Sequence, residues 1–215
     1  MICLTFNSNK MEIERKNMVM TTDTNEIDWE NSCKYGKLTE DFIADNKDKV
    51  YWKEVSANQT LSEDFIRRFK NYVDWDNISL HQKLSEDFIR EFKDYVDWDT
   101  ISLVQTISED FIREFQDKVD WKGISMRSSL SEDFIREFQD KVDWGAVSVQ
   151  ARLSEAFIEE FKDKVNWMLI SSFQTLSEAF IEKYEDSVDW YWIARHQTLS
   201  LDFKKKYKML LNAVV

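Results

Sequence analysis

The sequence predicts an all-α fold, an α-solenoid of about seven full 23-residue helix-turn-helix repeats with a partial cap at each end. A fixed period of roughly 20–50 residues is typical of repeat architectures. Here tryptophan recurs every 23 residues without insertion, at Trp29, Trp52, Trp75, Trp98, Trp121, Trp144, Trp167 and Trp190. The 215 residues also include no proline and only three glycines, which favours helices joined by tight turns.

The first helix of each repeat is predicted from the pattern of residues 84–106, LSEDFIREFKDYVDWDTISLVQT. Its apolar residues fall on one face at helical spacing, at Leu84, Phe88, Ile89 and Phe92. Ser85 is a suitable N-cap, and the two acidic residues that follow it suit the positive end of the helix dipole. We therefore expect a first helix of about ten residues.

The second helix of the repeat is expected to be shorter and to begin after Asp97, a second potential N-cap. It carries Trp98 and Ile101 toward the core, and Val96 bridges the two helices. Isolated helices below about 12–15 residues are marginal in water. Each repeat must therefore bury its apolar residues against its neighbours, as stacked repeat proteins do.

The ends of the array depart from the repeat. We expect a divergent cap or flexible arm at residues 1–26, tandem repeats at residues 27–198, and a capping half-repeat at residues 199–215. In the last unit Lys204 takes the slot that holds Ile181 one repeat earlier, and Lys205 follows it. A lysine in a stacking slot is what an exposed terminal face requires, so we assign Lys204 and Lys205 to the C-terminal cap.

The tryptophan row has two interpretations, a stacking platform for nucleobases or a structural core. Strict periodicity together with valine and isoleucine partners favours the core. The structural core is therefore predicted to include Trp52, Trp75, Trp98, Trp121, Trp144, Trp167 and Trp190.

Other repeated polar residues are also interpreted structurally. The acidic pairs such as Glu86-Asp87 suit helix starts and can pair with Arg90 on the same helix. The recurring glutamine, as at Gln82, is either an amide ladder along the stack or an exposed turn residue. Cys33 stands in a slot that otherwise holds serine, which predicts a packed rather than a reactive thiol. With only two cysteines, a reducing intracellular compartment is expected.

No motif predicts catalysis, so we expect a non-enzymatic protein without catalytic residues, metal site, cofactor or small-molecule substrate. His81 and His196 occupy the same repeat position five repeats apart and cannot share a metal ion. The net charge of −12 argues against a nucleic-acid partner, which needs clustered basic residues. No stretch reaches transmembrane length, and the MICLTF start is too short for a signal-peptide core.

The repeats differ most in the second helix, and this variation suggests a binding surface. Large apolar residues replace polar ones near the C-terminus, giving a candidate interaction surface of Met168, Leu169, Phe173, Tyr191 and Trp192. An exposed apolar patch of this kind would mark an interface. The alternative is that the tail, residues 209–215, folds back and covers it.

The run LSEDFIREFKDYVDWDTIS, followed by glutamine and another LSEDFI-like segment, resembles the tandem repeats of uncharacterised proteins from giant DNA viruses of amoebae and from some phages. The resemblance extends from about residue 27 to about residue 208. It implies an α-helical repeat, a viral origin, and a place in the host cytoplasm or the virion. It implies no activity, and the first 25 residues and the lysine-rich end depart from it.

Three hypotheses for function follow. The leading one is a scaffold that binds a host or viral protein through the second helices and the apolar patch. The alternative is a structural role, in which the chain self-assembles as a homodimer or associates with the virion. A third is an acidic decoy for a basic nucleic-acid-binding protein.

Overall fold

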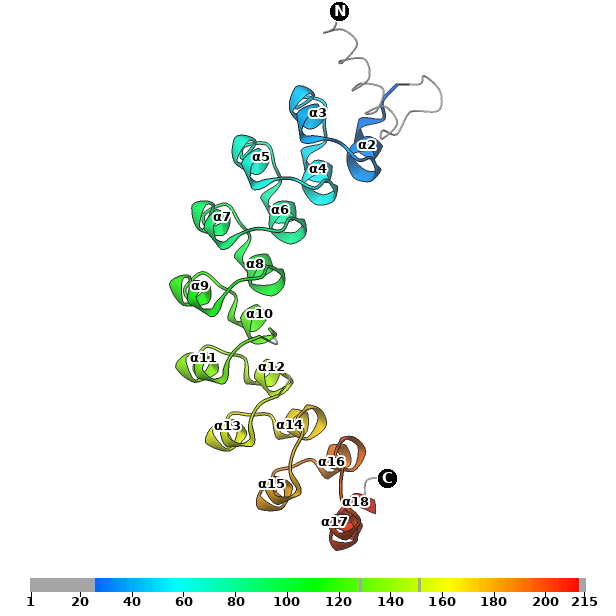
Figure 1. Cartoon of the computed structure of the whole chain (residues 1–215), viewed down its shortest axis with the longest axis vertical. Helices are drawn as coiled ribbons and strands as arrows, with labels where there is room; N and C mark the ends of the chain where they lie inside the picture. Colours follow the sequence, from blue (N-terminus) through cyan, green and yellow to red (C-terminus); the bar gives the residue numbers. More distant parts are fainter. Residues whose placement is uncertain (1–25, 128, 151, 213–215) are drawn as a thin grey trace, which may run out of the picture. The chain divides into compact units, whose positions relative to one another are not determined.

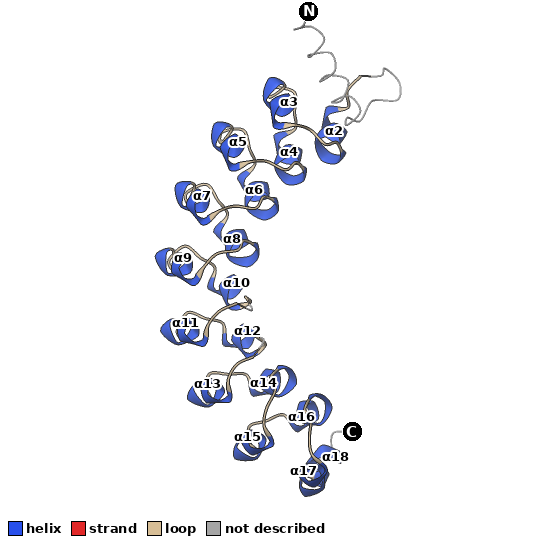
Figure 2. Cartoon of the chain, in the orientation of Figure 1, coloured by secondary structure: helices blue, strands red, loops and turns tan. Residues whose placement is uncertain are grey.

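The predicted fold class is confirmed by a computed structural model, which describes residues 26–127, 129–150 and 152–212. Every regular element in these ranges is a helix, and short loops join the helices (Figure 2). The chain forms an α-solenoid divided into two compact units, unit 1 (Met1–Phe111) and unit 2 (Ile112–Val215). The predicted N-terminal cap, apart from Glu26, lies outside the described residues.

Unit 1 contains three full helix pairs and the start of a fourth. In Figure 1 its odd-numbered helices form one row and its even-numbered helices form a second row beside it. Its helices are α2 (Trp29–Tyr35), α3 (Glu40–Asp45), α4 (Trp52–Asn58), α5 (Glu63–Arg68), α6 (Trp75–His81), α7 (Glu86–Glu91) and α8 (Trp98–Val104), followed by the first residues of α9 (Glu109–Glu114).

Unit 2 continues the alternation after the end of α9. Its helices are α10 (Trp121–Ser125), α11 (Glu132–Glu137), α12 (Trp144–Ser148), α13 (Glu155–Glu160), α14 (Trp167–Phe173), α15 (Glu178–Lys183), α16 (Trp190–His196), α17 (Leu201–Lys206) and α18 (Lys208–Asn212). We call the odd-numbered helices the A helices and α2 to α16 of the even-numbered series the B helices. Successive B helices pack on one another within each unit.

The A helices are shorter than expected, with six residues instead of about ten. In the repeat of α7, the helix ends at Glu91, and the N–H groups of Tyr95 and Val96 both donate to the carbonyl of Phe92, at 2.9 and 3.1 Å. This turn reverses the chain so that Val96 is buried and Asp97 adopts an extended conformation. The seven-residue helix α8 is therefore the longer member of the pair, which corrects the predicted order of lengths.

Both predicted N-caps are confirmed. The hydroxyl of Ser85 accepts a hydrogen bond from the N–H of Phe88 at 3.2 Å, and the carboxylate of Asp97 accepts one from Thr100 at 2.6 Å. An N-cap of this kind stabilises a helix by about 1 kcal/mol. Equivalent bonds begin most other helices in both units, as at α5, α6, α13 and α14.

The tryptophans lie at the edge of the core. Those predicted as core are half-buried, whereas Phe88, Ile89 and Ile101 are fully buried. The indole of Trp75 stacks on Phe88 of the next A helix, with ring centroids 6.2 Å apart, and its N–H donates to the carbonyl of Lys70 at 3.0 Å. This corrects the expectation of an interior position: the indole N–H needs an acceptor, and that acceptor lies in a surface turn.

The glutamine ladder is confirmed as a set of bonds between successive repeats. The side-chain oxygen of Gln82 accepts from the N–H of Leu61 at 3.1 Å. Its amide nitrogen donates to the carbonyls of Ser56 at 2.9 Å and Gln59 at 2.8 Å. One side chain thus satisfies three backbone groups, two in the preceding repeat and one at the start of its own repeat. The same three-bond pattern occurs at Gln59, Gln105, Gln174 and Gln197.

The fold is irregular where the ladder is interrupted. The glutamine slot holds Ser128 and Ala151 in two successive repeats, whose B helices, α10 and α12, have five residues instead of seven. Gln150, one position early, is buried and donates to the carbonyl of Ser125 at 2.9 Å. Arg152 follows with φ = 74°, in the left-handed region that a non-glycine residue rarely adopts.

Replacing Gln82 by alanine should leave the N–H of Leu61 and the carbonyls of Ser56 and Gln59 buried without partners. Each of these three unsatisfied groups costs about 1 kcal/mol or more, so we expect the free energy of unfolding in urea to fall by at least about 3 kcal/mol. Alanine at the adjacent, exposed Lys83 is the control and should change it by less than about 0.5 kcal/mol. Equal losses in the two variants would contradict a stabilising role of the ladder.

Candidate interaction surface

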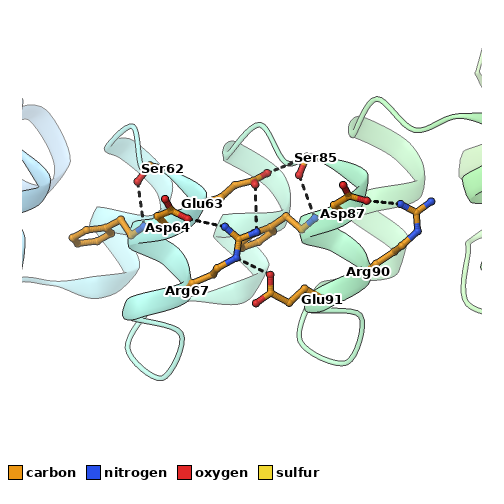
Figure 3. A network of polar contacts seen from close by, with 10 residues as sticks. Ser62, Glu63, Asp64, Arg67, Ser85, Asp87, Arg90 and Glu91 are labelled. Carbon is orange, nitrogen blue, oxygen red and sulfur yellow. Dashed lines mark hydrogen bonds and ion pairs between the residues drawn. The ribbon is translucent and has the colours of Figure 1, made fainter.

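The outer side of the A helices is a network in which charges bind one another (Figure 3). Arg67 contacts Asp64 at 2.9 Å and, in the next repeat, Glu91 at 2.6 Å. Its guanidinium lies 5.0 Å from the ring centroid of Phe88. Corresponding pairs between repeats join Arg113 to Glu137 and Arg136 to Glu160.

The last repeats also form an ion pair between neighbours, but here the basic residue lies in the later repeat and the acidic residue in the earlier one. Lys183 pairs with Glu159 of the preceding repeat, and Lys206 pairs with Glu182 at 3.0 Å. The hydrogen bond from Lys183 lowers the pKa of Glu159, which favours its charged form. The charges on the A helices therefore serve contacts between repeats.

The acidic residues at the starts of the A helices also have a structural role. The carboxylate of Glu63 accepts a hydrogen bond from the N–H of Ser85, the N-cap of the next A helix, at 2.7 Å. Glu86, Glu132 and Glu155 bind the next N-cap serine in the same way. Among the described residues, no group of three or more histidine, cysteine, aspartate or glutamate side chains is placed to hold a metal ion.

The candidate surface residues lie on two neighbouring helices, α14 and α16, which pack on each other. Phe173 is 60% exposed, Met168 48% and Tyr191 40%. Leu169 and Trp192 are only half-buried. The ring centroid of Trp192 lies 5.0 Å from that of Tyr191 and 5.1 Å from that of His196. The structure therefore brings the five residues onto one pair of B helices.

The alternative that the tail folds back over the candidate surface is not seen in the described part of the tail. Helix α18 contacts α16 and takes the place of a further B helix, while Met168, Phe173 and Tyr191 stay exposed. Met209 of α18 itself is 87% exposed. Residues 213–215 lie outside the described part.

Exposed apolar residues extend beyond the two helices that the sequence singled out. We call the exposed residues of the B helices and of their C-caps the B face. On this face, unit 1 exposes Leu80, Leu103 and Val104, and unit 2 also exposes Met126 and Val149. The sequence contained a signal for them, because the slot two residues before the glutamine slot holds Leu80, Leu103, Met126 and Val149. The candidate surface did not include them, because it was defined by large apolar residues that replace polar ones near the C-terminus.

A hollow of about 330 Å³ adjoins the B face of unit 2. It is lined by Arg152, Leu153, Phe173, Gln174 and Thr175. Phe173 and Arg152 both line this hollow, so an apolar group and an acidic group of a partner could be bound together there.

The two residues assigned to the C-terminal cap are exposed. Lys204 is exposed where Ile181, in the equivalent slot one repeat earlier, is fully buried. Lys205 contacts Asp202 at 3.3 Å.

Cys33 is fully buried at the position that serine occupies in other repeats. Ser79, in an equivalent slot, accepts a hydrogen bond from the N–H of Asp97 at 3.0 Å. At Cys33 the thiol is approached by the backbone of Tyr51, and burial raises its pKa. The neutral thiol is therefore favoured, which agrees with a packing role.

No family model, curated protein or solved structure matches this chain. The resemblance to viral tandem repeats therefore stays a prediction. Among the described helices, none combines the length and apolar composition needed to cross a membrane.

In a Cys3→Ser variant, a thiol reagent should modify Cys33 at least about 100-fold more slowly in the folded chain than in denaturant, because the thiol is buried and reaction needs local opening. The measurement is the rate of thiolate release at constant pH. Modification of the folded chain at the unfolded rate would show that the slot is accessible.

Proposed function

We propose that this chain is a non-enzymatic helical-repeat scaffold that binds a protein partner through its B face. One observation carries the proposal. The charges of the A helices are occupied by contacts between repeats, whereas the B helices expose large apolar side chains that no described residue covers.

The chemistry of the B face in unit 2 suits a protein interface. Interfaces are enriched in aromatic residues, methionine and arginine, and a few such residues supply most of the binding energy. Phe173, Tyr191 and Met168 are exposed there, and Arg195 lies 3.8 Å from the ring centroid of Tyr191. This stacking holds the tyrosine ring in place, which lowers the entropy lost on binding.

The repeat architecture supports the same use. The A helices and the buried rows vary little between repeats, while the B face varies. A constant support with a variable surface is the arrangement by which solenoids recognise proteins. The non-enzymatic part of the proposal rests on the repetition itself, in which the recurrent polar groups have structural partners.

The proposed setting follows from the sequence. A viral origin is implied by the resemblance of the repeats, and an intracellular, reducing compartment agrees with the buried, neutral thiol of Cys33. In that setting the partner is a host or viral protein.

The triple variant Met168→Ser, Phe173→Ser, Tyr191→Ser should bind its partner at least about tenfold more weakly, because each truncated anchor contributes on the order of 1–2 kcal/mol. The measurement is covalent capture by a photo-crosslinking group placed on α16, in the cells that express the chain. The thermal unfolding of the triple variant should be unchanged, since all three side chains are exposed.

The matched control is Leu201→Ser, Met209→Ser, which removes exposed apolar groups outside the B face. Capture should stay at the parent level in this control. Equal capture by the triple variant and the parent would overturn the proposed function.

A further inference from the structure

The hollow beside Phe173 is lined by polar groups that have no partner. Arg152 is exposed, and among the described residues its guanidinium forms no ion pair or hydrogen bond. The same holds for the exposed hydroxyl of Thr175. Phe173, which lines the hollow with them, is 60% exposed. The hollow therefore combines a cation, a hydroxyl group and an aromatic ring, all within unit 2.

The two loops that form the hollow are tied to each other by the glutamine ladder. Gln174 is buried, and its side-chain oxygen accepts a hydrogen bond from the N–H of Leu153 at 2.9 Å. Its amide nitrogen donates to the carbonyls of Ser148 at 3.1 Å and Gln150 at 2.6 Å. The lining is thus held in place without a ligand. A preformed site loses less entropy on binding than one that must be ordered.

The backbone at Arg152 favours a use for its side chain. Arg152 is the one non-glycine residue with a positive φ, 74°, in the part of the chain that the structure describes. Glycine adopts this conformation without steric cost, whereas arginine is strained by it. The same slot holds Ser129 one repeat earlier and Thr175 one repeat later, so stacking does not require a cation there. An arginine at this position is therefore not explained by the fold.

The B helices of unit 2 place the hollow in basic surroundings. From the tryptophan of each of these helices to the N-cap serine of the next A helix, the sequence contains no acidic residue. The basic residues in these segments are Lys122, Arg127, Arg152 and Arg195. The aspartates that precede α10, α12 and α16 are occupied as N-caps at the other ends of the helices. Glu155, which follows the hollow in sequence, binds the N–H of Ser177. A negatively charged partner is therefore attracted to this surface.

A single unpaired guanidinium favours a carboxylate over a phosphate. The N–H groups of arginine form a fork that matches the two oxygens of a carboxylate. Phosphorylated motifs are instead bound by clusters of arginines. Arg152 is the only charged residue among the described residues that line the hollow. With Phe173 in the same lining, a matching ligand carries a carboxylate close to a large apolar group.

We propose that this hollow is the site at which the B face of unit 2 binds its partner, and that it takes an acidic peptide segment. The inference rests on the proposed function, since it requires the B face to be a binding surface, and it adds the chemistry of the partner. An aspartate or glutamate of the segment accepts hydrogen bonds from Arg152 and Thr175, and a neighbouring apolar side chain packs on Phe173. A volume of about 330 Å³ is at the lower end of ligand sites, which suits a short segment.

The experiment pans a display library of random peptides, each about 12 residues long, against the full chain. Enriched peptides should carry an acidic residue within about three residues of leucine, isoleucine or phenylalanine, because an extended chain spans only about 3.3–3.6 Å per residue. A synthetic, fluorescently labelled copy of the enriched peptide is then titrated with the parent chain. Lysine in place of its acidic residue should weaken binding at least about tenfold.

Two variants of the hollow test the assigned contacts. Arg152→Gly should weaken peptide binding at least about tenfold, while thermal unfolding should not occur at a lower temperature, because glycine relieves the strain at φ = 74°. Phe173→Ser should weaken binding to a similar extent. In Arg152→Glu the preference should reverse, so that the lysine-substituted peptide binds more tightly than the acidic one.

The matched control is Lys162→Ala, Leu201→Ser, which removes an exposed cation and an exposed apolar group of unit 2 outside the B face. This control should bind the peptide like the parent. A parent that enriches no peptide, enriched peptides without an acidic residue, or unchanged binding in Arg152→Gly would each overturn the inference. Phenylbutyrate that binds as tightly as the peptide would also overturn it, and would assign the hollow to a small carboxylic acid.

Failure of this inference and failure of the proposed function give different results. If no peptide depends on Arg152 while covalent capture of a partner still depends on Met168, Phe173 and Tyr191, the partner binds the B face through other contacts and the proposed function stands. If neither peptide binding nor capture depends on any B-face residue, both are wrong.

Discussion

The structure depends on hydrogen bonds from side chains of one repeat to backbone groups of its neighbour. A helix leaves four N–H groups unpaired at its start and four carbonyls unpaired at its end. In helices of five to seven residues, these unpaired groups outnumber the internal bonds. Gln82, Ser79 and Glu63 each bond to the backbone of an adjacent repeat. Stacking is thus required by the polar backbone as well as by burial of phenylalanine and isoleucine.

This requirement divides the surface of the molecule into two kinds. Several residues of the A helices and the loops, such as Glu63, Arg67 and Gln82, are held to particular types because they bond an adjacent repeat. The outer positions of the B helices make no such bond, so they vary without disturbing the stack. Where the ladder lacks its glutamine, α10 and α12 shorten and the backbone of Arg152 takes an unusual conformation. Arg152 also lines the hollow beside Phe173, so the missing glutamine goes with a change in the backbone at the binding surface.

The fold could be predicted in detail because its signals are local and repeated. Serine and aspartate caps, the apolar spacing around Phe88 and Ile89, and the tryptophan period all lie within one 23-residue unit. The errors have a common physical cause. The A helix was expected to run through Phe92, but the chain turns there, with the N–H groups of Tyr95 and Val96 bonded to the carbonyl of Phe92, and this turn goes with the burial of Val96. Trp75 was expected to be interior, but its N–H bonds a carbonyl at the surface. For the candidate surface, the sequence located Phe173 and Tyr191 and missed Leu80 and Leu103.

The sequence by itself determined the period, the order of the helices, their caps and the apolar rows, because each of these follows from residue type and spacing along one segment. Only the tertiary structure decided which side chains remain free. Glu63 and Asp76 are both acidic residues in the first turn of a helix, yet Glu63 binds the next repeat and Asp76 does not. The difference arises because stacking brings the N-cap of the following A helix to Glu63, while Asp76 stays exposed. Whether a charged side chain is structural or available for binding therefore depends on a partner about 22 residues away in the sequence, and not on the residue type alone.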